Sequence, residues 1–224
     1  MPRSPRVDVK DYYYHVINRA SARLTLFESK KDYSLFEAVL TEAVKKFDMR
    51  VIAYCCMPNH FHLLLQPKND GDLSMFMYWF TMTFTSRWHA IKHTTGSGHI
   101  FQGRFKSFLV QNDPHLLTVI RYIERNPLRA GLVKKSERWR YSSLYRRLFG
   151  TPKQKKVITE PEVQLPADYL SFVNEPLSES ELQAVRRCTK KCMPYGSNPW
   201  RDRMVDRFRL QATLREKGRP RKSS

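Results

Sequence analysis

Hydrophobic positions follow two different periods along the first part of the chain. Four short segments rich in aromatic and β-branched residues predict strands; they are residues 12–19, 49–57, 60–66 and 105–111. Three longer segments repeat apolar residues at helical spacing; they are residues 31–48, 72–93 and 113–126. The predicted order is therefore strand, helix, strand, strand, helix, strand, helix.

Turn and capping residues indicate where these elements begin and end. Pro58 and Asn59 separate the second and third strands, as the turn of a hairpin would. Asp72 and Asp113 can cap the helices that they precede, and Pro127 marks the end of the third helix. The pattern predicts an α+β fold, a ferredoxin-like sandwich in which helices cover an antiparallel sheet.

The composition changes after about residue 150. Residues 157–185 hold six acidic residues and no Lys or Arg, whereas residues 186–224 hold thirteen basic and three acidic residues. We therefore predict a folded domain over residues 1–150, an acidic, proline-containing linker over 151–185, and a basic helical extension over 186–224.

Two further helices are predicted near the C-terminus, over residues 178–192 and 198–217, with Ser178 and Asn198 as their caps. The acidic stretch before them is a solvated linker in the simpler interpretation. In the alternative, it folds over a basic nucleic-acid-binding face and lowers non-specific affinity.

A large positive charge indicates a polyanionic partner. Forty Lys and Arg against 21 Asp and Glu give a formal net charge of +19, which favours nucleic acid or an anionic membrane. No segment approaches the ~20 consecutive apolar residues of a bilayer span, and the first residues lack the apolar core of a signal peptide. We expect a nucleic-acid partner, no membrane, and a cytoplasmic, nucleoid-associated protein.

The four cysteines fit a reducing compartment. Cys55 and Cys56 are adjacent in a predicted strand, so their side chains point to opposite faces and cannot readily form a disulfide. Cys188 and Cys192 lie four residues apart without a second Cys or His pair at zinc-site spacing. We interpret all four as reduced thiols, with a zinc site at the second pair as the alternative.

Two histidines on one strand are the first candidates for chemistry. His60 and His62 flank Phe61, and because side chains alternate along a strand, both imidazoles project to one face. Tyr122 and Asn126 lie four residues apart on the third helix and share one of its faces, which could lie over the histidines. Two imidazoles and an amide oxygen form a mixed site with open positions, which suits Mg²⁺ or Mn²⁺.

Such a group of residues can cleave a phosphodiester. A bound cation would polarise the phosphate while the Tyr122 hydroxyl attacks phosphorus and expels a sugar hydroxyl, which leaves a phosphotyrosine link. This link conserves the energy of the phosphodiester, so a strand can later be rejoined without ATP. Taken alone, a histidine pair on a strand is more often a surface or core feature, and a helical tyrosine more often serves packing. The sequence does not identify the group that would activate Tyr122.

Several ordered motifs over residues 12–149 resemble one protein family. They are YYYHVINR (12–19), MPNHFHLLL (57–65), HIFQGRFKSF (99–108), YIERNPLRAGLV (122–133) and WRYSS (139–143). Together they resemble the REP-associated tyrosine transposases, a branch of the single-tyrosine HUH transposases in which two histidines flank a bulky apolar residue.

The resemblance implies an HUH tyrosine transposase catalytic domain over residues 1–150 with a ferredoxin-like fold. It makes His60 and His62 metal ligands, Tyr122 the nucleophile, and Asn126 a third ligand, where insertion-sequence relatives often carry Gln. It further implies a requirement for Mg²⁺ or Mn²⁺ and cleavage of single-stranded REP/BIME-type hairpins beside a short guide tetranucleotide. Insertion-sequence relatives act as dimers, whereas this branch is more prone to act as a monomer.

Candidate DNA contacts lie in the same motifs and in the C-terminal tail. In the motifs they are Asn18, Arg19, Arg104 and Lys106, each with solvated surface as the alternative. The terminus EKGRPRKSS resembles an AT-hook, in which Arg219 enters an A·T minor groove beside Lys217 and Arg221. A basic tail that merely attracts phosphates is the alternative there.

The sequence therefore predicts site-specific nicking and strand transfer on hairpin-bearing single-stranded DNA through a 5′-phosphotyrosine intermediate. One alternative is a domesticated, non-cleaving DNA-binding protein of the same fold. The other is an RNA-binding ferredoxin-like module, which would stack bases on sheet aromatics and need neither metal nor nucleophile.

Overall fold

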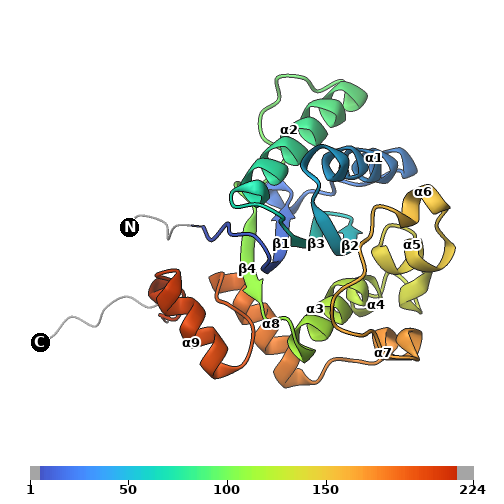
Figure 1. The fold of residues 1–224 in the computed structure, drawn as a ribbon. Helices are drawn as coiled ribbons and strands as arrows, with labels where there is room; N and C mark the ends of the chain where they lie inside the picture. The colour runs from blue at the N-terminus through green and yellow to red at the C-terminus, as the bar shows by residue number, and fades with distance from the viewer. Residues whose placement is uncertain (1–5, 216–224) are drawn as a thin grey trace, which may run out of the picture.

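A four-stranded antiparallel sheet forms the centre of the computed structural model, which describes residues 6–215 (Figure 1). Its strands are β1 (Tyr13–Arg19), β2 (Arg50–Met57), β3 (His60–Gln66) and β4 (Lys106–Val110). They lie in the order β2-β3-β1-β4, and each neighbouring pair is antiparallel. This order, with a helix after β1 and another after β3, is the ferredoxin-like arrangement, so the predicted fold class is confirmed.

The β2–β3 hairpin turns where the sequence predicted it. Met57 pairs with His60 across the turn, so Pro58 and Asn59 form a two-residue loop. The turn places the first histidine of the pair at the very start of β3.

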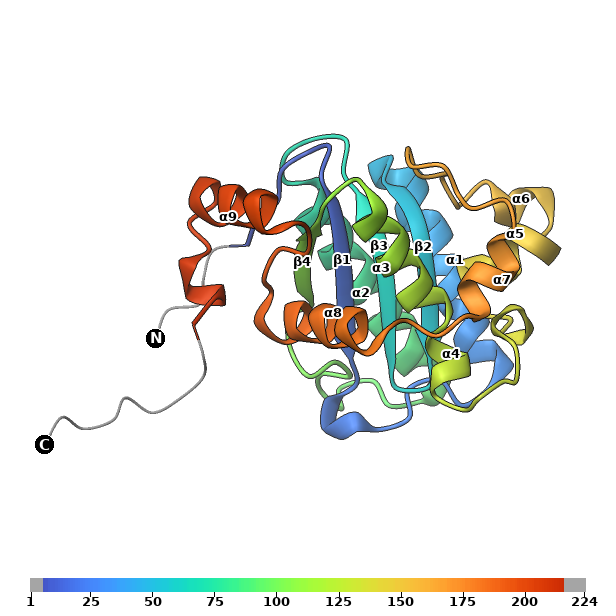
Figure 2. The same ribbon diagram turned by 90° about the horizontal axis from the view of Figure 1, so that it is seen from below.

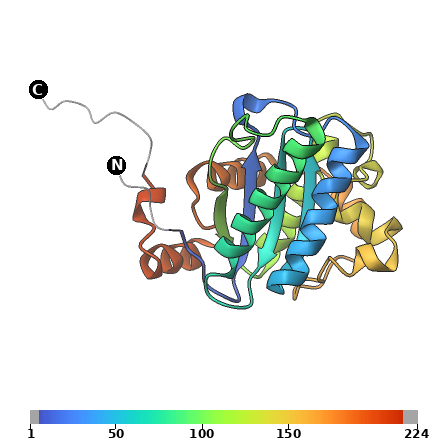
Figure 3. The same ribbon diagram turned by 90° about the horizontal axis from the view of Figure 1, so that it is seen from above.

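Two long helices cover one face of the sheet (Figure 3). They are α1 (Lys30–Phe47) and α2 (Asp72–Lys92). A capping box between Ser29 and Asp32 begins α1. Gly71, in the left-handed region at φ +86°, is the N-cap of α2, so the prediction that Asp72 caps this helix was wrong.

Phenylalanines of α2 form part of the hydrophobic core. Phe76, Phe80 and Phe84 are fully buried against α1 and the sheet, and they form ring contacts with Phe36, Phe47, Phe61 and Phe101. These ring pairs and the buried aliphatic side chains hold α1 and α2 on the sheet.

The opposite face of the sheet carries α3 (Pro114–Glu124), with α8 (Glu179–Lys191) beside it (Figure 2). Asp113 caps α3 as predicted, because its side chain accepts from the His115 amide. The helix ends at Glu124, and the short helix α4 (Asn126–Arg129) follows with Pro127 in its first turn. Tyr122 and Asn126 therefore lie on adjoining helices rather than on one continuous helix.

The remaining helices follow α4 in the chain. They are α5 (Ser143–Phe149), α6 (Pro152–Lys155), α7 (Tyr169–Asn174) and α9 (Asn198–Arg207). Short 3-10 turns lie at Ser21–Arg23, Ser136–Arg138 and Gln211–Thr213. Ser178 caps α8 through a capping box, as predicted. For α9 the N-cap is Ser197, so the prediction of Asn198 was wrong, and the helix ends at Arg207 instead of the predicted 217.

The segment expected to be a solvated linker contributes to the hydrophobic core. Val173, Leu177 and Val185 are buried, and Leu177 and Val185 pack with residues of α3 and β4 in the core on that side of the sheet. The solvated-linker interpretation does not hold for these residues, because their apolar side chains are removed from water.

Both edges of the sheet are covered by other parts of the chain. At the β4 edge, Tyr195 exchanges backbone hydrogen bonds with Leu109 and Gln111 at 2.8 and 2.9 Å. At the β2 edge, the amide of Cys56 donates to Tyr141 and that of Thr159 donates to Val51. The covered edges leave little unpaired backbone at either side of the sheet for pairing with another chain. No helix among residues 6–215 is long and apolar enough to cross a membrane.

Candidate functional site

The face of the sheet under α3 brings three of the predicted site residues together. The rings of His60 and His62 lie 5.0 Å apart, centroid to centroid, because alternate residues of β3 project to one side. The ring of Tyr122 stands edge-on to His62 at 5.7 Å. The predicted meeting of a histidine pair on one strand with a tyrosine on a distant helix is therefore present in the geometry.

A third histidine, His15, lies in the same layer. Its Nε2 is 2.8 Å from Nδ1 of His62, and its ring is 6.0 Å from that of Tyr122. His60 in turn has its Nδ1 2.6 Å from the side-chain oxygen of Asn59. Each histidine of the predicted pair therefore uses one ring nitrogen within the protein, which leaves Nε2 of both rings for a ligand.

Burial keeps these imidazoles neutral at pH 7. It lowers the pKa of His60 and of His15 to about 3, and for His60 the charges of Arg19 and Arg129 act in the same direction. The pKa of His62 is well below its usual value, first because of burial and then because of the neighbouring His15 and His60. Neutral imidazole is the form that binds a metal ion.

Arg129 connects the tyrosine to the predicted amide ligand. Its guanidinium lies 4.3 Å from the ring centroid of Tyr122, and its Nη2 donates to the side-chain oxygen of Asn126 at 3.0 Å. Asn126 is buried, and its Nδ2 has no hydrogen-bond partner among residues 6–215.

The donor set fits a divalent cation of the Mg²⁺ or Mn²⁺ type. His60 and His62 supply two neutral imidazoles, and the amide oxygen of Asn126 has a second lone pair besides the one that accepts from Arg129. Within the described part of the chain, no three His, Cys, Asp or Glu side chains form a metal-binding group. Any cation here therefore depends on the amide or on non-protein ligands to complete its coordination.

A cationic groove leads away from Tyr122 across β4. It has a volume of about 890 Å³, and among the described residues that line it there are eight Arg and Lys and no Asp or Glu. The cations are Arg6, Arg19, Arg104, Lys106, Arg186, Lys190, Lys191 and Arg215. All four DNA contacts predicted in the motifs therefore line one groove together with the tyrosine; the fourth, besides the three cations, is Asn18.

The C-terminal extension forms one wall of this groove. Residues from α8 through Arg215 line it opposite the strand residues. No residue of 157–185 lines the groove. The alternative prediction, that the acidic stretch folds over the basic nucleic-acid-binding face, is therefore not supported at this groove. Lys217, Arg219 and Arg221, predicted to act as an AT-hook, lie outside the described residues.

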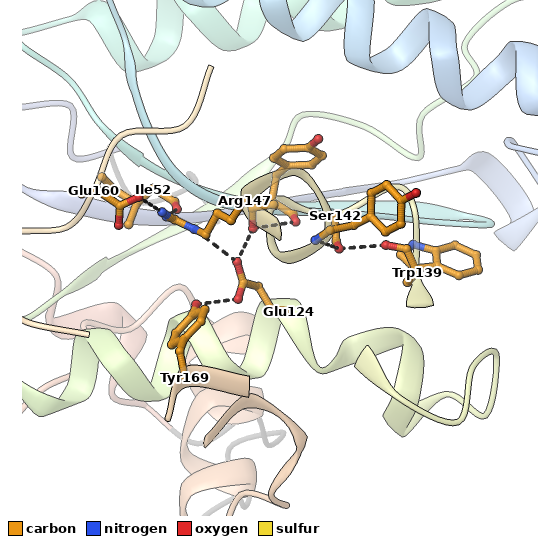
Figure 4. A network of polar contacts seen from close by, with 10 residues as sticks. Ile52, Glu124, Trp139, Ser142, Arg147, Glu160 and Tyr169 are labelled. Atoms are coloured by element: carbon orange, nitrogen blue, oxygen red, sulfur yellow. Dashed lines mark hydrogen bonds and ion pairs between the residues drawn. The ribbon is translucent and has the colours of Figure 1, made fainter. Parts of the chain in front are cut away.

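A buried polar network fixes α3 in place (Figure 4). The carboxylate of Glu124, fully buried, accepts from Ser143 Oγ and from the Tyr169 hydroxyl, both at 2.5 Å. Arg147, whose guanidinium donates to the carbonyl of Ile52 on β2 at 2.7 Å, lies 3.9 Å from the same carboxylate. Burial raises the pKa of Glu124, while Arg147, Ser143 and Tyr169 oppose the rise.

The outer face of α3 is tied to the following segment as well. Glu181 on α8 accepts from Arg121 at 2.9 Å and lies within hydrogen-bond distance of Thr118 Oγ1 at 3.4 Å. Arg125 donates to the carbonyl of Asn174 at the end of α7 at 3.1 Å. The segment Asp168 to Lys191 therefore forms a strap over the helix that carries Tyr122.

Comparison with known proteins identifies the family. The family of IS200-like transposases matches residues 8–126, which is more than half of the chain and includes the three histidines, Tyr122 and Asn126. The chain belongs to the IS200-like transposase family.

Relatives within this transposase family support the predicted branch. A putative REP-associated tyrosine transposase of Haemophilus influenzae is 27% identical over 119 residues, which cover 50% of this chain and 68% of the relative. A REP-associated tyrosine transposase of Escherichia coli K12 is 24% identical over 139 residues, which cover 60% of this chain and 76% of the relative. The resemblance to this branch is confirmed.

A solved structure shares the fold. The structure of a REP-associated tyrosine transposase bound to a REP hairpin superposes with a TM-score of 0.55 at 20% identity, and the match covers 80% of this chain and all of the other. The match extends beyond the residues that the family description covers, so part of the C-terminal third is also similar in fold.

Three residues of this candidate site were missed by the sequence reasoning. His15 interrupts the apolar part of β1, and a polar residue between Tyr14 and Val16 was a signal that could have been used. Arg129 lies in the motif that contains Tyr122, but its contacts depend on the break between α3 and α4. Glu124 has no signal in the sequence, since its partners lie 19 and 45 residues further along.

The polar network under α3 predicts that removing one hydroxyl group lowers the stability of the protein. Tyr169→Phe deletes one of the two hydroxyl donors to the buried Glu124 carboxylate, and a hydrogen bond to a charged group contributes roughly 1.5–3 kcal/mol. We expect the free energy of unfolding in urea to fall by about 2 kcal/mol. Tyr78→Phe, at a 70% exposed tyrosine of α2, is the control and should leave stability unchanged. Equal stability of the two variants would contradict the role of the network.

Proposed function

We propose that this chain is a metal-dependent, site-specific single-stranded DNA endonuclease and strand transferase. Its substrates are hairpin-forming palindromes of the REP type, which a related transposase of the same fold binds. The observation that carries the proposal is the position of Tyr122, beside the histidine pair and at the wall of a groove that eight Arg and Lys of residues 6–215 line.

The proposed reaction uses each group in the site for one task. His60 and His62 would hold the cation, with Asn126 as the third protein ligand. When bound, the cation polarises the scissile phosphate and neutralises the charge that develops on it. The hydroxyl oxygen of Tyr122 attacks phosphorus, a 5′-phosphotyrosine forms, and the 3′-hydroxyl of the other fragment leaves. Attack by a 3′-hydroxyl on the phosphotyrosine reverses the step and joins the strands.

Arg129 is placed to assist the nucleophile. A guanidinium 4.3 Å from the Tyr122 ring would stabilise the negative charge of a phenolate as it forms. The same residue fixes Asn126 through the hydrogen bond to its amide oxygen. The site thus supplies positive charge on the tyrosine side of the phosphate as well as on the metal side.

The groove is the proposed path of the single strand. Its charge suits a phosphate backbone, and Phe105 lines it beside Arg6, whose guanidinium lies 3.6 Å from the ring centroid. Phe105 itself is largely buried, as are Tyr13 and Phe101. These aromatic side chains therefore belong to the hydrophobic core and expose little surface for stacking on DNA bases. Phosphate attraction therefore contributes more to binding here than stacking does.

We further propose that one chain completes the reaction alone. The strap and the Glu124 network hold α3 over the histidines of its own chain, and both sheet edges are covered. A helix held in this way presents Tyr122 to its own metal site, with no need for a tyrosine from a second chain.

Covalent capture tests the nucleophile. Wild-type protein incubated with labelled single-stranded palindromes and Mn²⁺ should form an adduct that survives denaturing electrophoresis. EDTA should prevent it, and Tyr122→Phe should remove it while binding persists. Tyr78→Phe serves as the matched control and should form the adduct at the wild-type level.

Two outcomes of the same assay would favour the alternatives. A wild-type protein that binds the palindrome but gives no adduct, and behaves as Tyr122→Phe does, would be a non-cleaving DNA-binding protein. A preference for RNA that survives EDTA would indicate the RNA-binding module.

The groove predicts a change in the salt dependence of binding. Each phosphate contact adds about 0.7 to the slope of log K against log salt for a single strand. Replacing Arg104 and Lys106 by Ala together should lower the magnitude of this slope by about 1.4. The control pair, Lys45→Ala with Lys46→Ala, lies at the end of α1 outside the groove and should leave the slope unchanged. Equal slopes for the two double variants would exclude the groove as the DNA path.

Mixing two inactive variants tests whether one chain acts alone. Tyr122→Phe keeps the histidines, and a variant with both His60 and His62 replaced by Ala keeps the tyrosine. We expect the mixture to form no more adduct than either variant by itself, because each active site needs both parts in one chain. Restored adduct in the mixture would show that the tyrosine comes from a second chain.

A further inference from the structure

The position of His15 calls for a physical explanation. It lies in the middle of β1, on the face under α3, and is fully buried between the rings of Phe108, Tyr122 and His62. A polar ring in such surroundings costs stability unless its nitrogens are paired. Only Nε2 is paired, and Nδ1 has no partner among residues 6–215. Stability alone would favour an apolar residue here.

The contact between His15 and His62 is a hydrogen bond in the plane of both rings. The planes differ by only 10°, and the centroids are 5.0 Å apart. Nε2 of one ring and Nδ1 of the other are 2.8 Å apart, which with the radii of two five-membered rings accounts for the separation of the centroids. Rings stacked face to face would have centroids closer together. The geometry is therefore directional and fixes the rotation of the His62 ring.

The position of the proton between His15 and His62 determines whether Nε2 of His62 can bind a cation. If Nδ1 of His62 donates to His15, then Nε2 of His62 carries a lone pair. If Nε2 of His15 donates instead, the proton of the neutral His62 ring lies on its own Nε2, which then cannot bind a cation. Only the first arrangement is compatible with metal binding through Nε2.

We propose that His15 is a positioning residue for the metal site: it accepts the Nδ1 proton of His62, sets the ring orientation, and leaves Nε2 for the cation. The inference rests on the proposed function, because it assigns His62 as a ligand. Hydrogen-bond partners behind metal ligands act in this way, and their removal typically costs about 10–100-fold in metal affinity. His15 does not contact the cation or the DNA in this role.

Mn²⁺ affinity of the intact protein without DNA tests the role. Free Mn²⁺ is measured by electron paramagnetic resonance while the wild type, His15→Leu and His15→Gln are titrated. We expect the leucine variant to raise the dissociation constant about 10–100-fold. Glutamine can place an acceptor oxygen near the position of Nε2, so it should recover most of the affinity.

His89→Leu is the matched control for loss of a buried histidine. His89 is also buried and has both nitrogens within hydrogen-bond distance of partners, Thr94 Oγ1 at 2.7 Å and the Gly98 carbonyl at 3.0 Å. It lies at the end of α2 on the other face of the sheet. We expect its replacement to leave Mn²⁺ affinity unchanged, whatever it does to the melting temperature.

The outcomes separate this inference from the proposed function. Saturable Mn²⁺ binding by the wild type with equal affinity in folded His15→Leu would overturn the role of His15 alone. So would a glutamine variant as weak as the leucine variant, because packing would then explain the loss. Absence of saturable binding by the wild type would overturn this inference, whereas absence of the Mn²⁺-dependent adduct with the palindrome would overturn the proposed function.

A second measurement needs no variant. Nitrogen-15 NMR of the wild-type protein with Mg²⁺ should show His62 as the Nδ1–H tautomer. The Nε2–H tautomer at saturating Mg²⁺ would overturn the proposal, even if the leucine variant failed to fold.

Discussion

The contact of Tyr122 with His62 makes the whole site depend on where α3 lies. The histidines are fixed by the sheet, since their strand lies between two others and the ring of His62 is held by His15. The tyrosine is fixed mainly by how its helix packs. Buried apolar residues of α3, the carboxylate of Glu124 and the strap on the outer face act on one helix of eleven residues. Loss of that packing would separate the tyrosine from the histidines.

Positively charged side chains are concentrated beside the same site. The basic groove begins at Tyr122 and continues along β4 to the C-terminal extension. Three of the six acidic residues of residues 157–185 are engaged elsewhere: Glu181 with Arg121, Glu160 with Arg147, and Glu162 with Asn112. An acidic stretch that looked like a separate linker therefore neutralises charge around α3 and leaves the groove positive.

Much of the fold could be predicted because its signals are local. Strand and helix periods, the Pro58–Asn59 turn and the Asp113 cap each depend on residues close in sequence, and the element order then leaves few topologies. The histidine pair was also local, because alternation along one strand fixes it. The predicted N-caps of α2 and α9 were wrong because the preceding residue, Gly71 or Ser197, is the N-cap in the structure. Contacts such as Glu124 with Tyr169, or His15 with His62, join distant segments and required the structure.

If the chain cleaves DNA as proposed, one cation, both imidazoles and the tyrosine hydroxyl meet at a single phosphate. Crystals of Tyr122→Phe grown with a single-stranded palindrome and Mn²⁺ would test this arrangement most directly, through the anomalous signal of manganese. We expect one manganese peak within coordination distance of His60 and His62 and of a DNA phosphate, with the substituted phenyl ring on α3 facing that phosphate. A manganese ion bound elsewhere, or a phosphate on the far side of the histidines from α3, would contradict it.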